Sequence, residues 1–86
     1  MSYEKVTKLK SRIIIGTKQA LKAMKNGSIH EVYLAMDADQ HIIQKVEQLA
    51  RELNIPCQYV DSKKKLGTAC GIEVGASTVA VKKQAH

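Results

Sequence analysis

The stretch IIIGTKQALKAMKNG, residues 13–27, carries the pattern of a strand, a turn and a helix in that order. Its three isoleucines, residues 13–15, form a β-branched run that stops at Gly16, which is typical of a short buried strand. Thr17 is of a residue type that often caps helices, and Asn26-Gly27 is a helix C-terminal signal. The apolar face of the helix between them holds Ala20, Leu21 and Met24. The stretch therefore predicts one strand–turn–helix unit of an α/β protein.

The same alternation continues along the rest of the chain. Further strands are predicted over residues 31–36, 57–60 and 78–81. Further helices are predicted over residues 2–11, from the apolar residues spaced between Ile42 and Leu53, and over residues 63–70 with Ser62 as cap. Strands that alternate with helices favour a sheet covered on both faces, so we expect an α/β fold of the three-layer α/β/α type. Because 86 residues bury only one modest core, residues 1–86 are expected to form a single domain.

The sequence indicates a soluble cytoplasmic protein. The first residues, MSYEKVTKLK, alternate charged and apolar positions, and no later stretch approaches the ~18 consecutive apolar residues that a membrane span requires. Cys57 and Cys70 form no CxxC pair and have no histidine at metal-ligand spacing. We therefore expect two reduced, mostly buried thiols, with no metal and no other cofactor.

The formal charge of +6 is divided unevenly along the chain. Residues 1–25 have a balance of +6, residues 26–61 of −4 and residues 62–86 of +4. If the fold brings the two basic thirds together, they form one positive face, which suits a polyanion. Lysines used only for solubility are the alternative. The chain has three Tyr but no Trp or Phe, which argues against a module that stacks single-stranded bases on aromatic side chains.

The start of the helix in the opening stretch is the first candidate for a binding site. Lys18, Lys22 and Lys25 lie at i, i+4 and i+7, so they share one face of that helix. Gly16 permits close approach of a ligand to the backbone, and the free amides of the following helix can donate to an anion. A solvated helix face is the alternative for these lysines.

Two carboxylates, Asp37 and Asp39, follow the strand predicted over residues 31–36. Such a pair at a strand end could hold a divalent cation and would suit a metal-dependent enzyme. Asp39 also stands where the next helix needs a cap, and no further ligand is near in sequence. We favour capping, and because the histidines are scattered without an acid–base pair, we predict that the protein is not an enzyme.

Four stretches taken together resemble a known family. They are GTKQALKAMKNG, VYLAMDAD, NIPCQYVDSKKKLGTACG and IEVGAS, and with the order of elements they cover nearly all of the chain. The sequence is similar to the kink-turn RNA-binding ribosomal proteins of the archaeal and eukaryotic large subunit and to their short bacterial relatives of the YbxF type. The resemblance implies a three-layer sandwich around a four-stranded mixed sheet. It also implies binding of the kink-turn, a sharply bent RNA with a short bulge beside tandem sheared G·A pairs.

In that family the RNA contacts the end of the first strand, the helix after it and the loop before the last strand. By position, the resemblance implies that Gly16 and Thr17 approach the RNA backbone. The same resemblance implies that Lys18, Gln19 and Lys22 contact the G·A pairs. It also implies a loop that rests against the extruded bulge base, formed by Ile72, Glu73, Val74, Gly75 and Ala76. Lys18 and Gln19 stand where archaeal members commonly have Asn and Glu, so the resemblance leaves the affinity and the preferred kink-turn open.

The leading hypothesis is a monomeric protein that binds a kink-turn in ribosomal RNA, a riboswitch or another noncoding RNA. The ribosome is a further candidate partner, and a membrane is not expected. The alternative is a basic accessory protein that binds ribosomal RNA through charge alone. Lys63–Lys65 are expected at the end of the sheet away from the loop, and Gly67 within their helix predicts tight packing. The sequence assigns no role to Glu73.

Overall fold

Strands and helices alternate in the computed structural model, which describes residues 12–83. The strands are β1 (Ile13–Ile15), β2 (Ile29–Ala35), β3 (Cys57–Val60) and β4 (Thr78–Lys82). The helices are α2 (Thr17–Lys25), α3 (Gln40–Glu52) and α4 (Lys63–Ala69). The helix predicted over residues 2–11 lies outside the described residues. Within residues 12–83, no helix is both long enough and apolar enough to cross a membrane.

The strands form one mixed sheet in the order β1-β4-β2-β3. β4 pairs antiparallel with β1 on one side and with β2 on the other, and β3 pairs parallel with β2. In this register Ile14 is opposite Ala80, and Leu34 is opposite both Thr78 and Tyr59. The first and last strands of the described chain are therefore neighbours.

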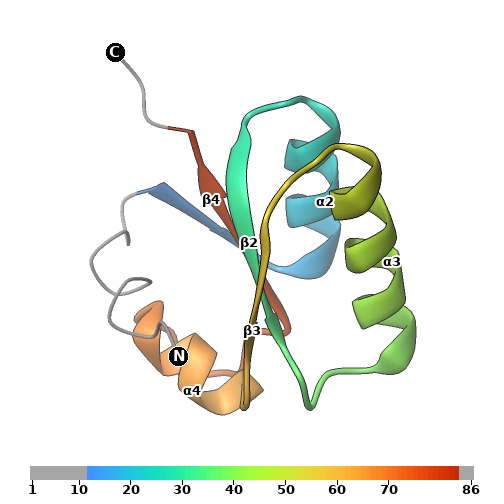
Figure 1. Cartoon of the computed structure of the whole chain (residues 1–86). Helices are drawn as coiled ribbons and strands as arrows, with labels where there is room; N and C mark the ends of the chain where they lie inside the picture. The colour runs from blue at the N-terminus through green and yellow to red at the C-terminus, as the bar shows by residue number, and fades with distance from the viewer. Residues whose placement is uncertain (1–11, 84–86) are drawn as a thin grey trace.

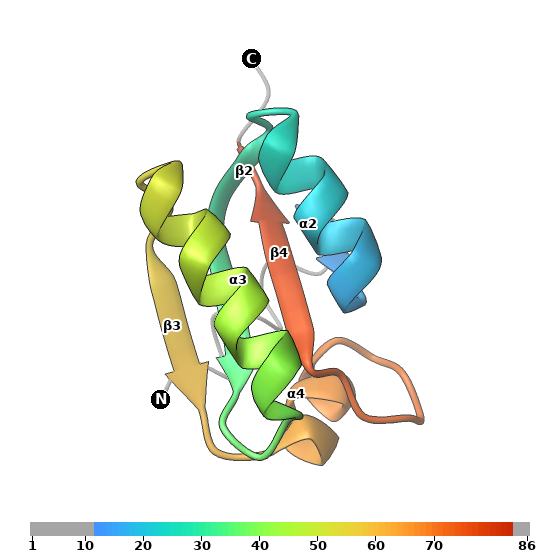
Figure 2. The same ribbon diagram turned by 90° about the vertical axis from the view of Figure 1, so that its right-hand side faces the viewer.

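Helices cover both faces of the sheet (Figure 1). α2 and α3 lie side by side against one face and contact each other, whereas α4 lies on the opposite face (Figures 1 and 2). The prediction of a three-layer α/β/α sandwich with a four-stranded mixed sheet is thus confirmed.

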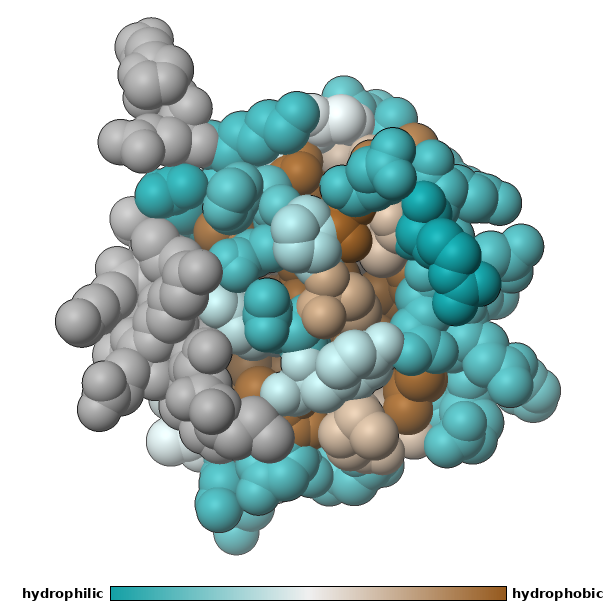
Figure 3. Space-filling view, viewed as in Figure 1, coloured by the Kyte–Doolittle hydropathy of each residue, from teal (hydrophilic) through white to brown (hydrophobic). Residues whose placement is uncertain are grey.

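The two central strands carry most of the buried core. Six of the seven residues of β2 and four of the five residues of β4 are buried. Helix α3 adds Ile43, Val46 and Ala50 from its inner side, and the side chains over α3 in Figure 3 are mostly hydrophilic. Complete burial of a side chain such as Leu34 contributes about 1.5–3 kcal/mol. The core therefore fixes the sheet and, through it, the positions at which the helices begin.

Strand direction makes the two ends of the sheet different. β1, β2 and β3 run the same way, because β1 and β2 are both antiparallel to β4 and β3 is parallel to β2. Their last residues lie at one end of the sheet, together with Thr78, the first residue of β4; we call this the carboxyl end. Each described helix follows one of these three strands, so α2, α3 and α4 all begin there. Because helix N-termini carry partial positive charge, this end is suited to anions.

The bounds of β2 differ slightly from the predicted 31–36. The strand begins at Ile29, which pairs with Lys82 across an irregularity in the ladder. It ends at Ala35, because the chain then turns towards α3 while the Met36 amide still donates to the Val60 carbonyl at 2.7 Å. The side chain of Met36 is 55% exposed at the carboxyl end.

Candidate nucleic-acid interface

Gly16 joins β1 to α2 at the carboxyl end of the sheet. Its backbone has φ 109° and ψ 139°, a conformation that L side chains rarely adopt. Its amide donates to the Thr78 carbonyl at 3.0 Å, so β4 holds it in place. A Cβ added at Gly16 would meet no atom within 4 Å, so the space beside its backbone is open. The position combines a fixed backbone with room for a ligand.

The start of α2 corrects the prediction that Thr17 caps this helix. Gly16 occupies the N-cap position, and no side chain caps the helix. The Thr17 hydroxyl instead forms a hydrogen bond of 3.0 Å with the hydroxyl of Thr78, which is completely buried. The Thr17 side chain therefore ties α2 to β4, and within residues 12–83 the first amides of α2 have no side-chain acceptor.

The next residues of α2 present polar side chains to solvent. Lys18, Gln19 and Lys22 are all exposed, whereas Ala20 and Met24 on the inner face are fully buried. Lys18 and Lys22 are one helical turn apart, so their ammonium groups and the start of α2 contribute positive charge to the same region. This part of the predicted site is brought together as expected.

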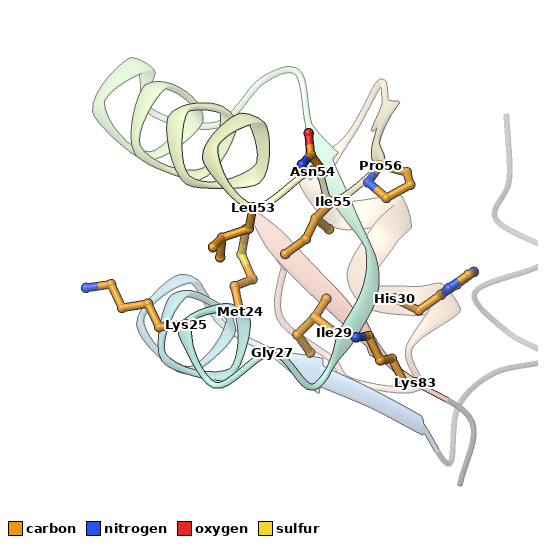
Figure 4. Close-up of a pocket in the computed structure, with 10 residues that line it drawn as sticks. All are labelled: Met24, Lys25, Gly27, Ile29, His30, Leu53, Asn54, Ile55, Pro56 and Lys83. Atoms are coloured by element: carbon orange, nitrogen blue, oxygen red, sulfur yellow. The ribbon is translucent and has the colours of Figure 1, made fainter. Parts of the chain in front are cut away.

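Lys25 does not belong to this region. It lies seven positions after Lys18, a rise of roughly 10 Å along a helix. It lies at the other end of the sheet beside a pocket of about 380 Å³, whose apolar lining includes Met24, Leu53 and Ile55. Figure 4 shows the Lys25 side chain extending away from these residues. The predicted row of three lysines is thus divided between the two ends of the molecule.

The loop between α4 and β4, residues 71–77, is anchored to α4 at two points. The Ile72 amide donates to the Gly67 carbonyl at 3.0 Å, and the Ala76 amide donates to the Lys63 carbonyl at 3.0 Å. Ala76 is buried, and Ile72 is half-buried against the core. These two residues hold the loop, whereas Val74, 71% exposed, projects from it with the exposed Glu73.

Two glycines allow the loop to lie against α4. A Cβ added at Gly67 would stand 2.1 Å from the Val74 carbonyl oxygen, and one added at Gly75 would stand 3.1 Å from the Lys63 Cβ. The first distance is a severe overlap with backbone. The predicted tight packing at Gly67 is therefore confirmed, and its partner is the loop itself.

The position of Lys63 corrects a second prediction. It lies against the loop and not at the far end of the sheet, because α4 begins at the carboxyl end of β3 and the chain turns back along α4 after Cys70. Lys63, Lys64 and Lys65 are exposed there. Sequence reasoning missed Lys63; the available signal was a pair of glycines, Gly67 and Gly75, that suited close contact between helix and loop.

Asp37 and Asp39 both accept hydrogen bonds at the starts of helices. The Asp39 carboxylate accepts from the His41 amide at 2.8 Å, which confirms the predicted cap of α3. Asp37 accepts from the Lys63 amide at 2.9 Å and so supports the start of α4 across 26 positions. Ser62 caps the same helix through the Lys65 amide at 3.3 Å, as predicted. Among residues 12–83, no group of three or more His, Cys, Asp or Glu side chains is arranged to hold a metal ion.

The start of α2 and the 71–77 loop adjoin each other across the end of the sheet. Gly16 bonds to the first residue of β4, and the Ser77 carbonyl just before it accepts from the Ala35 amide at 3.0 Å. Figure 2 shows the start of α2 above the loop that leads from α4 into β4. The two segments of the predicted site, separated by about fifty positions in sequence, therefore form one surface.

The two cysteines are not among the residues of this surface. Cys57 is half-buried and Cys70 is buried, and these two cysteines are not joined in a disulfide. Burial raises the pKa of the Cys57 thiol, so it stays protonated at neutral pH. On the same strand the Tyr59 hydroxyl donates to the Glu47 carboxylate, and this bond raises the pKa of the phenol.

A family model described as the ribosomal protein L7Ae/L30e/S12e/Gadd45 family matches residues 1–86. The chain belongs to this family. The resemblance seen in the sequence is thereby confirmed, including its short bacterial branch, because an RNA-binding protein named YbxF of Geobacillus stearothermophilus is 54% identical over 81 residues. That match covers 94% of this chain and 98% of the relative.

Other similar proteins support the same placement. An RNA-binding protein of Halalkalibacterium halodurans is 54% identical over 83 residues, covering 96% of this chain and 100% of the relative. The solved structure of a 15.5 kD RNA binding protein of Giardia lamblia has a TM-score of 0.89 at 27% identity, covering 95% of this chain and 71% of that one. These names, and the family description, are those of RNA-binding and ribosomal proteins and not of enzymes, so the prediction of a non-enzymatic protein is confirmed.

Proposed function

We propose that the protein binds RNA through the carboxyl end of its sheet, and that its target is a kink-turn. Membership of the ribosomal protein family and the RNA-binding relatives support the first part. The similarity to the Giardia RNA binding protein and the resemblance of the site residues support the second.

The observation that carries the proposal is the start of α2. Its first amides have no side-chain cap from the part of the chain that the structure describes, and the adjacent Gly16 backbone borders open space. A phosphate or a base-edge acceptor placed there satisfies those amides and interacts favourably with the helix dipole. Gly16 and Thr17 therefore approach the RNA backbone in our proposal.

The exposed side chains of α2 read the sheared G·A pairs. Lys22 donates to the O6 and N7 acceptors of a guanine, which an opened major groove exposes. Lys18 donates to a second guanine or to a phosphate. The Gln19 amide donates and accepts, which suits an adenine edge. Each contact requires a side chain exposed on the outer face of α2, and all three meet that condition: Lys18 and Gln19 lie near its start, and Lys22 lies one turn further along.

The 71–77 loop holds the bulged nucleotide. Val74 supplies the apolar contact, since it is the most exposed large apolar side chain of the described chain, while Ile72 and Ala76 keep the loop in place and Gly75 allows its close packing on Lys63. Lys63 beside the loop contributes to phosphate binding. Glu73 accepts a hydrogen bond from a base amino group, which offsets the charge repulsion of an acid near RNA.

The test is a binding titration on two RNAs. One contains a kink-turn, and in the other the G·A pairs are replaced by Watson–Crick pairs. We expect strong preference for the first. Equal affinity, with steep salt dependence for both, would reject the kink-turn and favour binding to ribosomal RNA through charge alone.

The cellular RNA is a separate question. Ribosomal RNA, a riboswitch and other noncoding RNAs can carry the same kink-turn, so we propose that a protein of this kind acts as a monomer on whichever of them contains it. Crosslinking in cells followed by RNA sequencing identifies the target. Recovery of ribosomal RNA with kink-turns at the crosslinked positions would support association with the ribosome, and recovery of unstructured RNA would contradict the proposal.

A further inference from the structure

A groove runs between α2 and α3, the two helices that lie side by side in Figure 2. Its first part, about 360 Å³ in volume, opens where the helices begin and is lined by Thr17, Lys18, Leu21, His41, Ile42 and Lys45. A second hollow of about 270 Å³ continues along the same helices and shares Leu21 and Lys45 with the first. The two hollows adjoin at Leu21 and Lys45, and the first lies next to the proposed RNA-binding surface.

The first part of the groove has an apolar floor and a positive rim. Leu21 and Ile42 are half-buried and pack against the core. Lys18 and Lys45 are exposed and border the groove from opposite helices. The nearby Asp39 is bonded within α3, accepting from the His41 amide at 2.8 Å and lying 3.6 Å from the His41 Nδ1 atom. The residues that line this first part include no acid, whereas Glu52 lines the second hollow together with Lys45.

The groove is continuous with the site at the start of α2. Thr17 and Lys18 belong to both, so a strand that contacts Gly16 and Lys18 needs only to continue across α2 to reach Lys45. An RNA strand carries phosphates at regular intervals, separated by riboses and bases with apolar faces. Two lysines over an apolar floor match that alternation.

We propose that this groove extends the RNA footprint onto α3 and holds the sugar–phosphate backbone of the strand that flanks the kink. Lys18 and Lys45 bind phosphates from the two sides, and Leu21 and Ile42 contact a ribose or a base between them. This inference rests on the proposed function, because it concerns the same RNA. It adds α3, and Lys45 in particular, to a surface that otherwise consists of α2, α4 and the 71–77 loop.

The test compares Lys45→Gln with Lys82→Gln on a kink-turn RNA with long helical arms. Lys82 is exposed at the end of β4, away from the carboxyl end, so its replacement reports the general effect of removing one positive charge. Loss of one phosphate contact lowers the slope of log K against log salt by about 0.7–0.9, which corresponds to about five- to eightfold in affinity at 0.1 M salt. We expect that loss for Lys45→Gln and a clearly smaller one for Lys82→Gln.

Shortening the RNA arms, one at a time, then locates the contact. Removal of the arm that crosses the groove is expected to weaken binding by the wild-type protein and to abolish the difference between wild type and Lys45→Gln. Equal effects of the two substitutions on the long RNA would overturn the proposal and leave the groove for another occupant, such as an acidic protein segment.

The result of the groove test can be distinguished from the result of the kink-turn test. Wild-type protein titrated on the RNA with Watson–Crick pairs reports kink-turn recognition alone. If that discrimination is present and Lys45→Gln behaves like Lys82→Gln, the groove proposal fails while kink-turn binding stands. If discrimination is absent, kink-turn recognition fails whatever the effect at Lys45.

Discussion

The three described helices all begin at the same end of the sheet, yet their first turns differ. α3 is capped by Asp39, and α4 is capped by Ser62 and supported by Asp37. α2 has no side-chain cap, and its N-cap residue is a glycine beside open space. A side-chain cap in place of glycine stabilises a helix by only a few tenths of a kcal/mol, so the glycine at the start of α2 is a small cost to the free protein. The capped starts serve the fold, and we propose that the uncapped start serves a ligand.

The largest effect is expected where α4 supports the 71–77 loop. Gly67→Ala would place a Cβ 2.1 Å from the Val74 carbonyl oxygen, so the loop has to move or the helix has to distort. We expect a loss of up to about 3 kcal/mol in the free energy of unfolding. Helix propensity alone predicts the opposite, a gain of up to ~1 kcal/mol.

Chemical denaturation measures the change at Gly67, and Thr68→Ala at the neighbouring exposed position is the control. A stabilised Gly67→Ala protein would contradict the close contact between α4 and the loop. A destabilised protein that still folds also allows a binding assay, in which reduced affinity for a kink-turn RNA is expected because Val74 is displaced.

The next effect concerns the exposed face of α2, the helix with the uncapped start. Lys22→Ala is expected to cost about 1–3 kcal/mol of binding free energy if Lys22 contacts a guanine, and to lower preference for sheared G·A pairs. Lys82→Ala is the matched control, because that lysine is exposed at the other end of the sheet. Calorimetric titration of both variants decides the matter: a Lys22 effect that appears equally on RNA without G·A pairs indicates a phosphate contact only.

The capped start of α3 should respond in the opposite manner. Asp39→Ala removes the acceptor of the His41 amide and is expected to lower the free energy of unfolding by about 1 kcal/mol. Because that amide is used within the fold, we expect little change in RNA affinity. Thermal denaturation and a binding titration on the same preparation give both quantities. Loss of affinity without loss of stability would show that Asp39 belongs to the binding surface.

The smallest expected effect on stability is at Lys18, and it tests directly how the start of α2 differs from the capped starts of α3 and α4. Lys18→Glu places an acid in the uncapped first turn of α2, where it interacts favourably with the helix dipole by about 0.3–1 kcal/mol. We expect the protein to become slightly more stable and to bind RNA more weakly. Lys18→Gln separates loss of the lysine from gain of the acid. If both stability and affinity rose, the start of α2 would not face a polyanion.

The local pattern of apolar and capping residues was sufficient to predict the strands and helices of the described chain. The isoleucine run before Gly16 predicted β1, and the apolar spacing after Asp39 predicted α3 and its cap. Such signals depend on residues within one or two turns of each other, and the sequence displays them directly.

Contacts between distant residues could not be predicted in the same way. Thr17 is of a residue type that often caps helices, but its hydroxyl forms a hydrogen bond with that of Thr78, 61 positions away. Lys63 lies beside the loop because the chain folds back along α4, and Asp37 supports that helix from the preceding crossover. Sequence alone suggested that each of these residues interacts with its neighbours in the chain. In the folded protein each one instead interacts with residues distant in sequence. The predicted position of the site came from the family resemblance, because local sequence alone does not distinguish one lysine-bearing helix start from another.

The most direct test of the central claim is an NMR titration of the isotope-labelled protein with a kink-turn RNA. Backbone amide signals report each helix start separately in one experiment. We predict that the largest shifts occur at residues 16–19 and 72–76, with much smaller shifts at the capped start of α3, and that the RNA with Watson–Crick pairs reproduces few of them. Shifts concentrated at the other end of the sheet, around Lys25 and Lys83, or identical for the two RNAs, would contradict the account.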